Sequence, residues 1–131
     1  MIFFRSDASY IIGTGHVVRC LTLAKGLRKL GKKCQFICRD HDGNLINKIK
    51  QDGFEVRVIS NNKKLTFKNN KDDLIPFHAN WLGASWEDDA EETMKLIHKD
   101  EVDLIVVDHY SIDNRWEKKL RLNSKKIMVI D

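Results

Sequence analysis

Short apolar runs alternate along this chain with segments of helical periodicity, and this alternation limits the possible folds more than any other feature. The strand-like runs are, in chain order, 2–5, 34–38, 54–60, 103–108 and 126–131. The last two are of the nearly continuous apolar type that is buried in parallel sheets. Alternating strands and helices with short connections predict an α/β fold, with a Rossmann-like parallel sheet and helices on both faces.

The helix-forming segments lie between these strands. Apolar residues recur at the i, i+3, i+4, i+7 spacing within 20–30, and Gly31 is placed to end that helix as a C-cap. Residues 45–49 predict a short helix that ends at Gly53, and 114–122 can form another. The predicted order therefore begins β-α-β-α-β.

The middle of the chain is less regular. Residues 61–80 lack a clear period and are rich in Asn, Lys and Asp, which indicates a long surface loop. Ser85 followed by Asp88 predicts a capping box at a helix start. The acidic side chains of 87–92 crowd the first turns, where the helix dipole favours negative charge. Since they point in all directions around a helix, they do not predict a metal site.

Length and composition predict one domain, residues 1–131, with 42% hydrophobic residues. No stretch approaches the roughly 20 apolar residues of a membrane span, and Arg5 and Asp7 interrupt any signal-peptide core. We therefore expect a cytoplasmic protein that does not bind a membrane. Its three cysteines form neither an even disulfide set nor a C-x-x-C metal pair, so we expect reduced thiols in the core.

The net charge of +4 hides an asymmetry between the two halves of the chain. Residues 1–65 hold 13 Lys and Arg against 5 Asp and Glu, whereas 66–131 hold 10 against 14. The basic half favours an anionic ligand. It lacks the interleaved aromatic residues that stack on bases, and its lysines lie mostly on the solvated face of one predicted helix, so we expect no nucleic-acid binding.

Open parallel sheets bind ligands at the carboxyl ends of their strands. Three groups of residues are predicted at that edge: Arg5, Ser6 and Asp7; Gly13, Gly15 and His16; Asp108, His109 and Tyr110. The glycine turn is no dinucleotide fingerprint, because position 18 is Val, and no G-K-[ST] follows to make it a phosphate-binding P-loop. What the glycines offer is close approach of a ligand to a helix N-terminus.

The histidine in this turn, His16, is a candidate general base, because an imidazole takes a proton near neutral pH. From spacing alone it could equally cap its helix or hydrogen-bond within the loop. His41 could reach the same edge, whereas His78 and His98 are predicted to be solvated. The role of His109 is ambiguous.

Several motifs together resemble one known family. They are FRSDASYIIGTGHVVRCLTLAKGL, WLG at 81–83, VVDHY at 106–110, WE at 116–117 and the terminal IMVID. In this combination the chain resembles the N-terminal domain of the UDP-2,4-diacetamido-2,4,6-trideoxy-beta-L-altropyranose hydrolases of pseudaminic acid synthesis. The resemblance covers the whole chain.

The resemblance implies a two-domain enzyme of the glycosyltransferase-B type with its active site between the domains. The family releases UDP by attack of water at the anomeric carbon, with inversion, and needs no metal or cofactor. His16 would be the base, and Tyr110 would line the site. The partners would be the UDP-sugar and a C-terminal domain that holds the nucleotide. Because the chain ends at the end of a strand, we expect a fragment that is inactive alone.

Further roles at this edge are hypotheses. Gly13 and Gly15 would admit the sugar and its phosphates, and Arg5 or Arg19 would offset phosphate charge. Asp7 or Asp108 would orient His16 or hold sugar hydroxyls. The alternatives are a glycosyltransferase with another acceptor in place of water and a noncatalytic nucleotide-sugar binding module. The sugar also stays open, since hydrolases of legionaminic-type or spore-coat sugars share much of the motif set.

Overall fold

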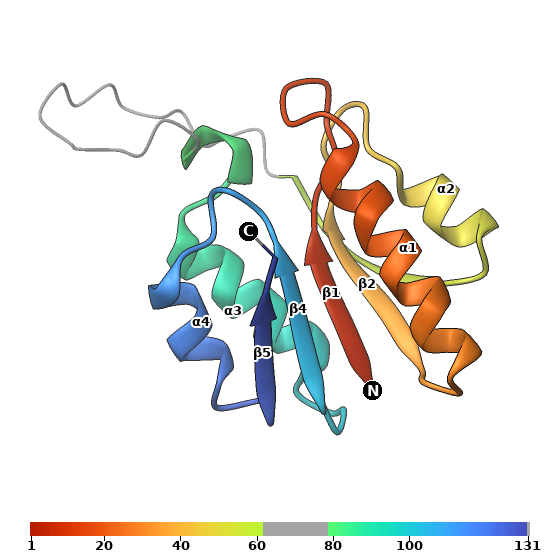
Figure 1. Cartoon of the computed structure of the whole chain (residues 1–131). Helices are drawn as coiled ribbons and strands as arrows, with labels where there is room; N and C mark the ends of the chain where they lie inside the picture. Colours follow the sequence, from red (N-terminus) through yellow and green to blue (C-terminus); the bar gives the residue numbers. More distant parts are fainter. Residues whose placement is uncertain (62–78, 131) are drawn as a thin grey trace, which may run out of the picture.

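The computed structural model describes residues 1–61 and 79–130, which form a five-stranded, all-parallel sheet in the order β3-β2-β1-β4-β5 (Figure 1). The strands are β1 (Ile2–Ser6), β2 (Cys34–Arg39), β3 (Glu55–Ile59), β4 (Leu104–Asp108) and β5 (Lys126–Val129). The helices are α1 (Gly15–Lys29), α2 (Ile46–Gln51), α3 (Trp86–Ile97), α4 (Asn114–Leu120) and the short 3₁₀ helix η1 (Ala79–Leu82). The predicted Rossmann-like α/β class is confirmed. Most of the predicted 61–80 loop, with His78, lies outside the described residues.

The helices cover the sheet in two layers. Helices α1 and α2 lie on one face, and α3 and α4 lie on the other (Figure 1). Alternate residues of β1 supply both cores, because successive side chains of a strand point to opposite faces. Phe4 stacks on Phe36 beneath α1, with ring centroids 5.0 Å apart. Phe3 packs with Ile37 and Trp116 on the α3 side.

Two predicted helix ends, at Gly31 and Ser85, are confirmed, whereas the helix predicted over 114–122 ends at Leu120. Gly31 has φ +80° directly after the C-cap of α1, as expected for a glycine that ends a helix. The Ser85 hydroxyl accepts a hydrogen bond from the Asp88 backbone N–H and so caps the N-terminus of α3. These local signals fix where the chain turns back to the sheet.

The prediction that 126–131 forms a buried strand is wrong in one respect. The strand forms, but Met128 is 38% and Val129 46% exposed. The reason is its position: β5 is the edge strand and pairs only with β4 among the described strands. An apolar run predicts a strand without revealing whether it lies at the edge of the sheet.

The cysteines are free, as expected, although they are not equally buried. Cys20 and Cys38 lie in the core, whereas Cys34 is half-buried. Burial raises the pKa of the Cys20 thiol to about 12, which keeps it protonated and unreactive. Within the described part of the chain, no helix is long and apolar enough to cross a bilayer.

Candidate functional site

The loop between β1 and α1 shapes the carboxyl edge of the sheet. Ser9 and Gly13 form an antiparallel bridge, and the Ser9 hydroxyl accepts hydrogen bonds from the backbone N–H groups of Ile11 and Ile12. Gly13 has φ +82°, which only glycine adopts without strain. Gly15 begins α1, and a Cβ built there would meet none of the described residues within 4 Å. The described residues therefore leave space beside the first residue of α1.

His16, in the first turn of α1, is held by an aspartate at the end of β4. Its Nδ1 lies 2.6 Å from Oδ1 of Asp108. Arg19, one turn further along the helix, donates from Nη2 to the same oxygen at 2.6 Å and from Nε to Oδ2. His16 and Asp108 are both buried, whereas the side chain of Arg19 is 43% exposed. Parallel pairing of β1 with β4 brings these segments together.

Charge and hydrogen bonding at Asp108 set the state of the His16 ring. Burial raises the pKa of Asp108, but hydrogen bonds from Arg19 and His16 outweigh burial and lower it, so the carboxylate is ionised. An ionised carboxylate only accepts, so Nδ1 of His16 carries the proton. Among the described residues no group hydrogen-bonds Nε2. In this tautomer Nε2 holds the lone pair and is the atom of the neutral imidazole that can accept a proton.

An aromatic pair begins next to this histidine: Tyr110 packs against His16, and Trp81 lies next to Tyr110. The Tyr110 ring meets the His16 ring edge to face, with centroids 4.6 Å apart and an interplanar angle of 85°. Trp81, from η1, lies next to Tyr110: their ring centroids are 6.1 Å apart and their ring planes are inclined by 47°. Tyr110 is 58% exposed and Trp81 is half-buried. The His16 ring thus has a carboxylate on one side and an aromatic wall on another.

Behind this edge, on the α3 side of the sheet, lies a buried network of charges. Arg5 donates to both oxygens of Asp7 at 2.7 and 3.1 Å and to both oxygens of Asp89 at 3.2 and 2.6 Å. All three side chains have 0% exposure. Arg5 and Asp7, predicted to contact substrate, therefore face each other inside the protein, and neither has surface available to a ligand.

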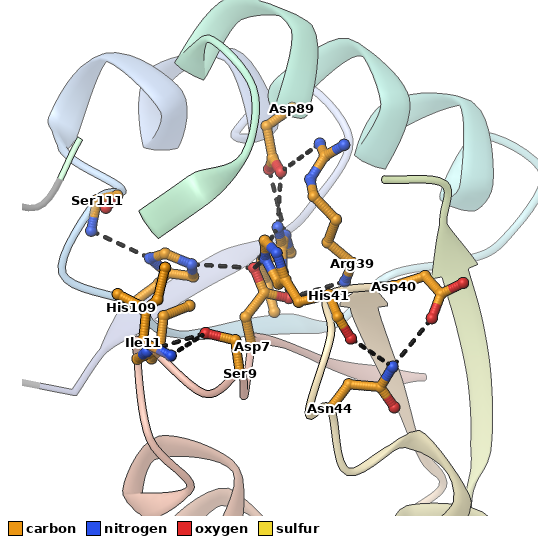
Figure 2. A network of polar contacts seen from close by, with 12 residues as sticks. Asp7, Ser9, Ile11, Arg39, Asp40, His41, Asn44, Asp89, His109 and Ser111 are labelled. Carbon is orange, nitrogen blue, oxygen red and sulfur yellow. Dashed lines mark hydrogen bonds and ion pairs between the residues drawn. The ribbon is translucent and has the colours of Figure 1, made fainter. Parts of the chain in front are cut away.

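The network extends to β2 and α3, as Figure 2 shows for Asp7, Arg39 and Asp89. Arg39 donates from its backbone N–H to Asp7 at 2.7 Å, and from Nη2 to Asp89 at 3.0 Å and Glu92 at 2.7 Å. Asp89 also accepts from the Trp116 indole at 2.9 Å. We did not predict this role of Asp89, because we expected the acidic side chains of 87–92 only to interact favourably with the helix dipole.

A signal for Asp89 was present in the sequence. The buried residues of α3 are Asp89, Ala90, Thr93 and Ile97, which share one helical stripe. An acid in the apolar stripe of a helix needs a buried partner, and an arginine within an apolar strand needs the same. Asp89 and Arg5 could have been matched on that ground.

Two histidines complete the network. Nε2 of His109 lies 2.9 Å and Nε2 of His41 lies 3.3 Å from Oδ2 of Asp7 (Figure 2). Nδ1 of His109 accepts the backbone N–H of Ser111 at 3.1 Å, so its Nε2 carries the proton that Asp7 receives. His41 does reach this edge, as expected, and His98 is exposed, as predicted. The ambiguous His109 is part of the buried network.

The described residues contain no group of three His, Cys, Asp or Glu side chains arranged to hold a metal ion. Surface hollows of about 430 and 370 Å³ lie at the opposite edge of the sheet, one lined by Ile97 and Val102 and the other by Met1 and Ile2. Neither includes His16.

The chain has distant relatives among known proteins, and no protein-family model matches it. It is 28% identical over 131 residues to the UDP-2,4-diacetamido-2,4,6-trideoxy-beta-L-altropyranose hydrolase of Campylobacter jejuni, covering 99% of this chain and 36% of that protein. It is 25% identical over 126 residues to the uncharacterized protein MJ1062 of Methanocaldococcus jannaschii, covering 96% of this chain and 20% of that protein. The chain thus spans about a third and a fifth of these relatives, and over its own length it is distantly similar to a UDP-sugar hydrolase.

Proposed function

We propose that this chain is the N-terminal domain of a UDP-sugar hydrolase in which His16 is the general base. The observation that supports the proposal is the contact between Nδ1 of His16 and Asp108, at the carboxyl edge of a parallel sheet, because it leaves the lone pair of the imidazole on Nε2. The similarity to the Campylobacter hydrolase supports the substrate class, UDP-2,4-diacetamido-2,4,6-trideoxy-beta-L-altropyranose.

The chemistry assigns one proton transfer to His16. Water attacks the anomeric carbon from the face opposite the leaving group, and its oxygen forms the new bond to carbon as Nε2 takes the proton. The bond between the anomeric carbon and the phosphate oxygen breaks, and UDP leaves with the electron pair, which inverts the configuration. A well-placed base contributes about 10²- to 10⁴-fold to such a step.

The other residues of this edge position the reactants. Asp108 keeps the proton on Nδ1 and stabilises the imidazolium that forms when Nε2 is protonated. Gly13, Gly15 and the open start of α1 admit the phosphates, whose charge the helix dipole and the exposed part of Arg19 offset. A C-terminal domain holds the nucleotide and supplies the second wall. Arg5 and Asp7 support the site from behind without touching substrate.

The test uses the full-length protein with UDP-2,4-diacetamido-2,4,6-trideoxy-beta-L-altropyranose, no acceptor, and UDP measured by chromatography. We expect His16→Gln to lower kcat by about 10²- to 10⁴-fold, because Gln cannot take the proton. The matched control is His98→Gln, since His98 is exposed at the end of α3. Full activity of His16→Gln would remove the base assignment. Release of UDP only after an acceptor is added would instead indicate a glycosyltransferase.

A further inference from the structure

The aromatic pair Trp81 and Tyr110 has no role in the proton transfer, yet Tyr110 packs against the His16 ring that performs it, and Trp81 lies next to Tyr110. We propose that this pair is the wall that binds the apolar face of the sugar, and that Trp81 selects substrates by the methyl groups they carry. The inference rests on the proposed function, because it names the part of the substrate that this site recognises. It adds Trp81 as a specificity-determining residue.

The exposure of the pair indicates a binding surface and not a core. Tyr110 is 58% exposed, although it stands next to buried His109. Trp81 is half-buried, whereas its neighbour Leu82 is 1% exposed and packs in the core on the α3 side. Large aromatic side chains left partly open next to a polar catalytic group are a common feature of small-molecule sites.

Trp81 is held on a rigid support. Leu82 anchors the segment in the core, and Gly83 turns it with φ +75°. A Cβ at Gly83 would lie 3.0 Å from Cε1 of His41 and 3.2 Å from Cδ of Arg39, so the backbone passes directly over these two side chains. The segment then enters α3 at the Ser85 cap. The backbone that carries the indole is therefore anchored in the core on its C-terminal side.

Tyr110 is held in the same way from the other side. His109, which precedes it, hydrogen-bonds Asp7 (Figure 2). The Ile112 backbone N–H also donates to the His109 carbonyl at 3.2 Å. Asp7 also receives His41, the residue beneath Gly83. One buried carboxylate thus supports both loops that carry the aromatic pair.

The chemistry of the pair fits a methyl-rich sugar better than a fully hydroxylated one. Aromatic faces gain free energy from covering C–H and methyl groups and lose it when they desolvate hydroxyls without a partner. The substrate named for the Campylobacter relative carries two acetamido groups and a deoxygenated C6, which supply three methyl groups. Tyr110 contacts the His16 ring, which acts at the anomeric carbon, so the aromatic wall lies next to the sugar. The uracil is separated from the sugar by two phosphates and therefore lies away from this wall.

The first experiment measures kcat/KM of the full-length protein for the trideoxy UDP-sugar, and Ki for UDP as a competitive inhibitor. We expect Trp81→Ala to lower kcat/KM by about 10- to 100-fold with Ki for UDP unchanged, and Trp81→Phe to restore most of the loss. Trp86→Phe, a tryptophan that packs under Arg115 and Lys119, is the matched control. An unchanged kcat/KM in Trp81→Ala, or an equal loss of affinity for UDP alone, would overturn the inference.

A second readout separates this inference from the proposed function. Tryptophan fluorescence of the full-length protein is titrated with the UDP-sugar and with UDP, in the wild type and in Trp81→Phe. We expect a change with the UDP-sugar that UDP does not produce and that Trp81→Phe lacks. Such a change without any turnover would refute the hydrolase and keep the sugar wall. Turnover without a Trp81-dependent change would refute the wall and keep the hydrolase.

Discussion

At the scale of single residues, Asp108 connects the groups that the sequence placed at one edge. It receives His16 at 2.6 Å and Arg19 from the same helix, and its own strand leads directly to Tyr110. The sequence predicted this meeting, because strands that pair in parallel end at the same edge. It did not predict that Asp7, at the same edge, would turn inward to Arg5.

We expect Asp108→Asn to lower kcat by about 10²- to 10⁴-fold in the full-length protein. An amide can donate to Nδ1 and so favour the wrong tautomer, with the proton on Nε2. Asp103→Asn, just before the other end of β4, is the matched control. Steady-state kinetics of UDP release measure the effect. A kcat for Asp108→Asn equal to that of Asp103→Asn would show that the carboxylate does not orient the ring.

At the scale of elements, the periodicity of the sequence located the strands and helices, while the edge position of β5 and the support under Trp81 escaped it. Burial of a strand depends on its neighbours in the sheet, which a local pattern does not contain. The need for glycine at position 83 also arises outside its own segment, from Arg39 at the end of β2 and His41 in the loop that follows. A glycine in the WLG motif gave no indication of what lies beneath it.

We expect Gly83→Ala to destabilise the chain by about 1–2 kcal/mol or more, because alanine is strained at φ +75° and its Cβ crowds the side chain of His41. Gly26→Ala is the matched control: Gly26 lies within α1, a Cβ there meets nothing within 4 Å, and alanine favours a helix by about 0.5–1 kcal/mol. Urea denaturation measures both. A stabilised Gly83→Ala would contradict the tight turn over β2.

At the scale of the whole molecule, the buried network joins β1, β2, α3, β4 and α4. Its charged members lie in β1, β2 and α3 or at their ends: Arg5, Asp7, Arg39 and Asp89. His109 connects β4 to this network, and Trp116 connects α4. The sequence could indicate that Asp89 and Arg5 each need a buried partner, but not the full set of contacts, because these depend on how α3 docks on the sheet. The network thus links these five elements to one another behind the candidate site.

We expect the network to make stability sensitive to acid. Burial raises the pKa of Asp7 and of Asp89, but the charge of Arg5 outweighs burial and holds each below its usual value. A lowered folded-state pKa contributes stability that is complete above the unfolded value of about 3.9 and is lost as the pH falls below it. Urea denaturation between pH 7 and pH 2 should show this loss.

The variant that isolates this contribution is Asp89→Asn. At pH 7 it should cost about 3–5 kcal/mol, because Arg5 and Arg39 lose a buried counter-charge. Its stability should also fall less steeply with acid than that of the wild type. Glu91→Gln, on the exposed face of the same helix, is the control. An acid dependence of Asp89→Asn identical to that of the wild type would contradict the charge assignment.

The most direct test of the central claim follows ¹⁸O from labelled water during hydrolysis of the UDP-sugar by the full-length protein. If His16 activates water for attack at the anomeric carbon, the label enters the released sugar and is absent from UDP. The rate of its incorporation should then fall by about 10²- to 10⁴-fold in His16→Gln. Label in the phosphate of UDP, or an unchanged rate in His16→Gln, would contradict the account.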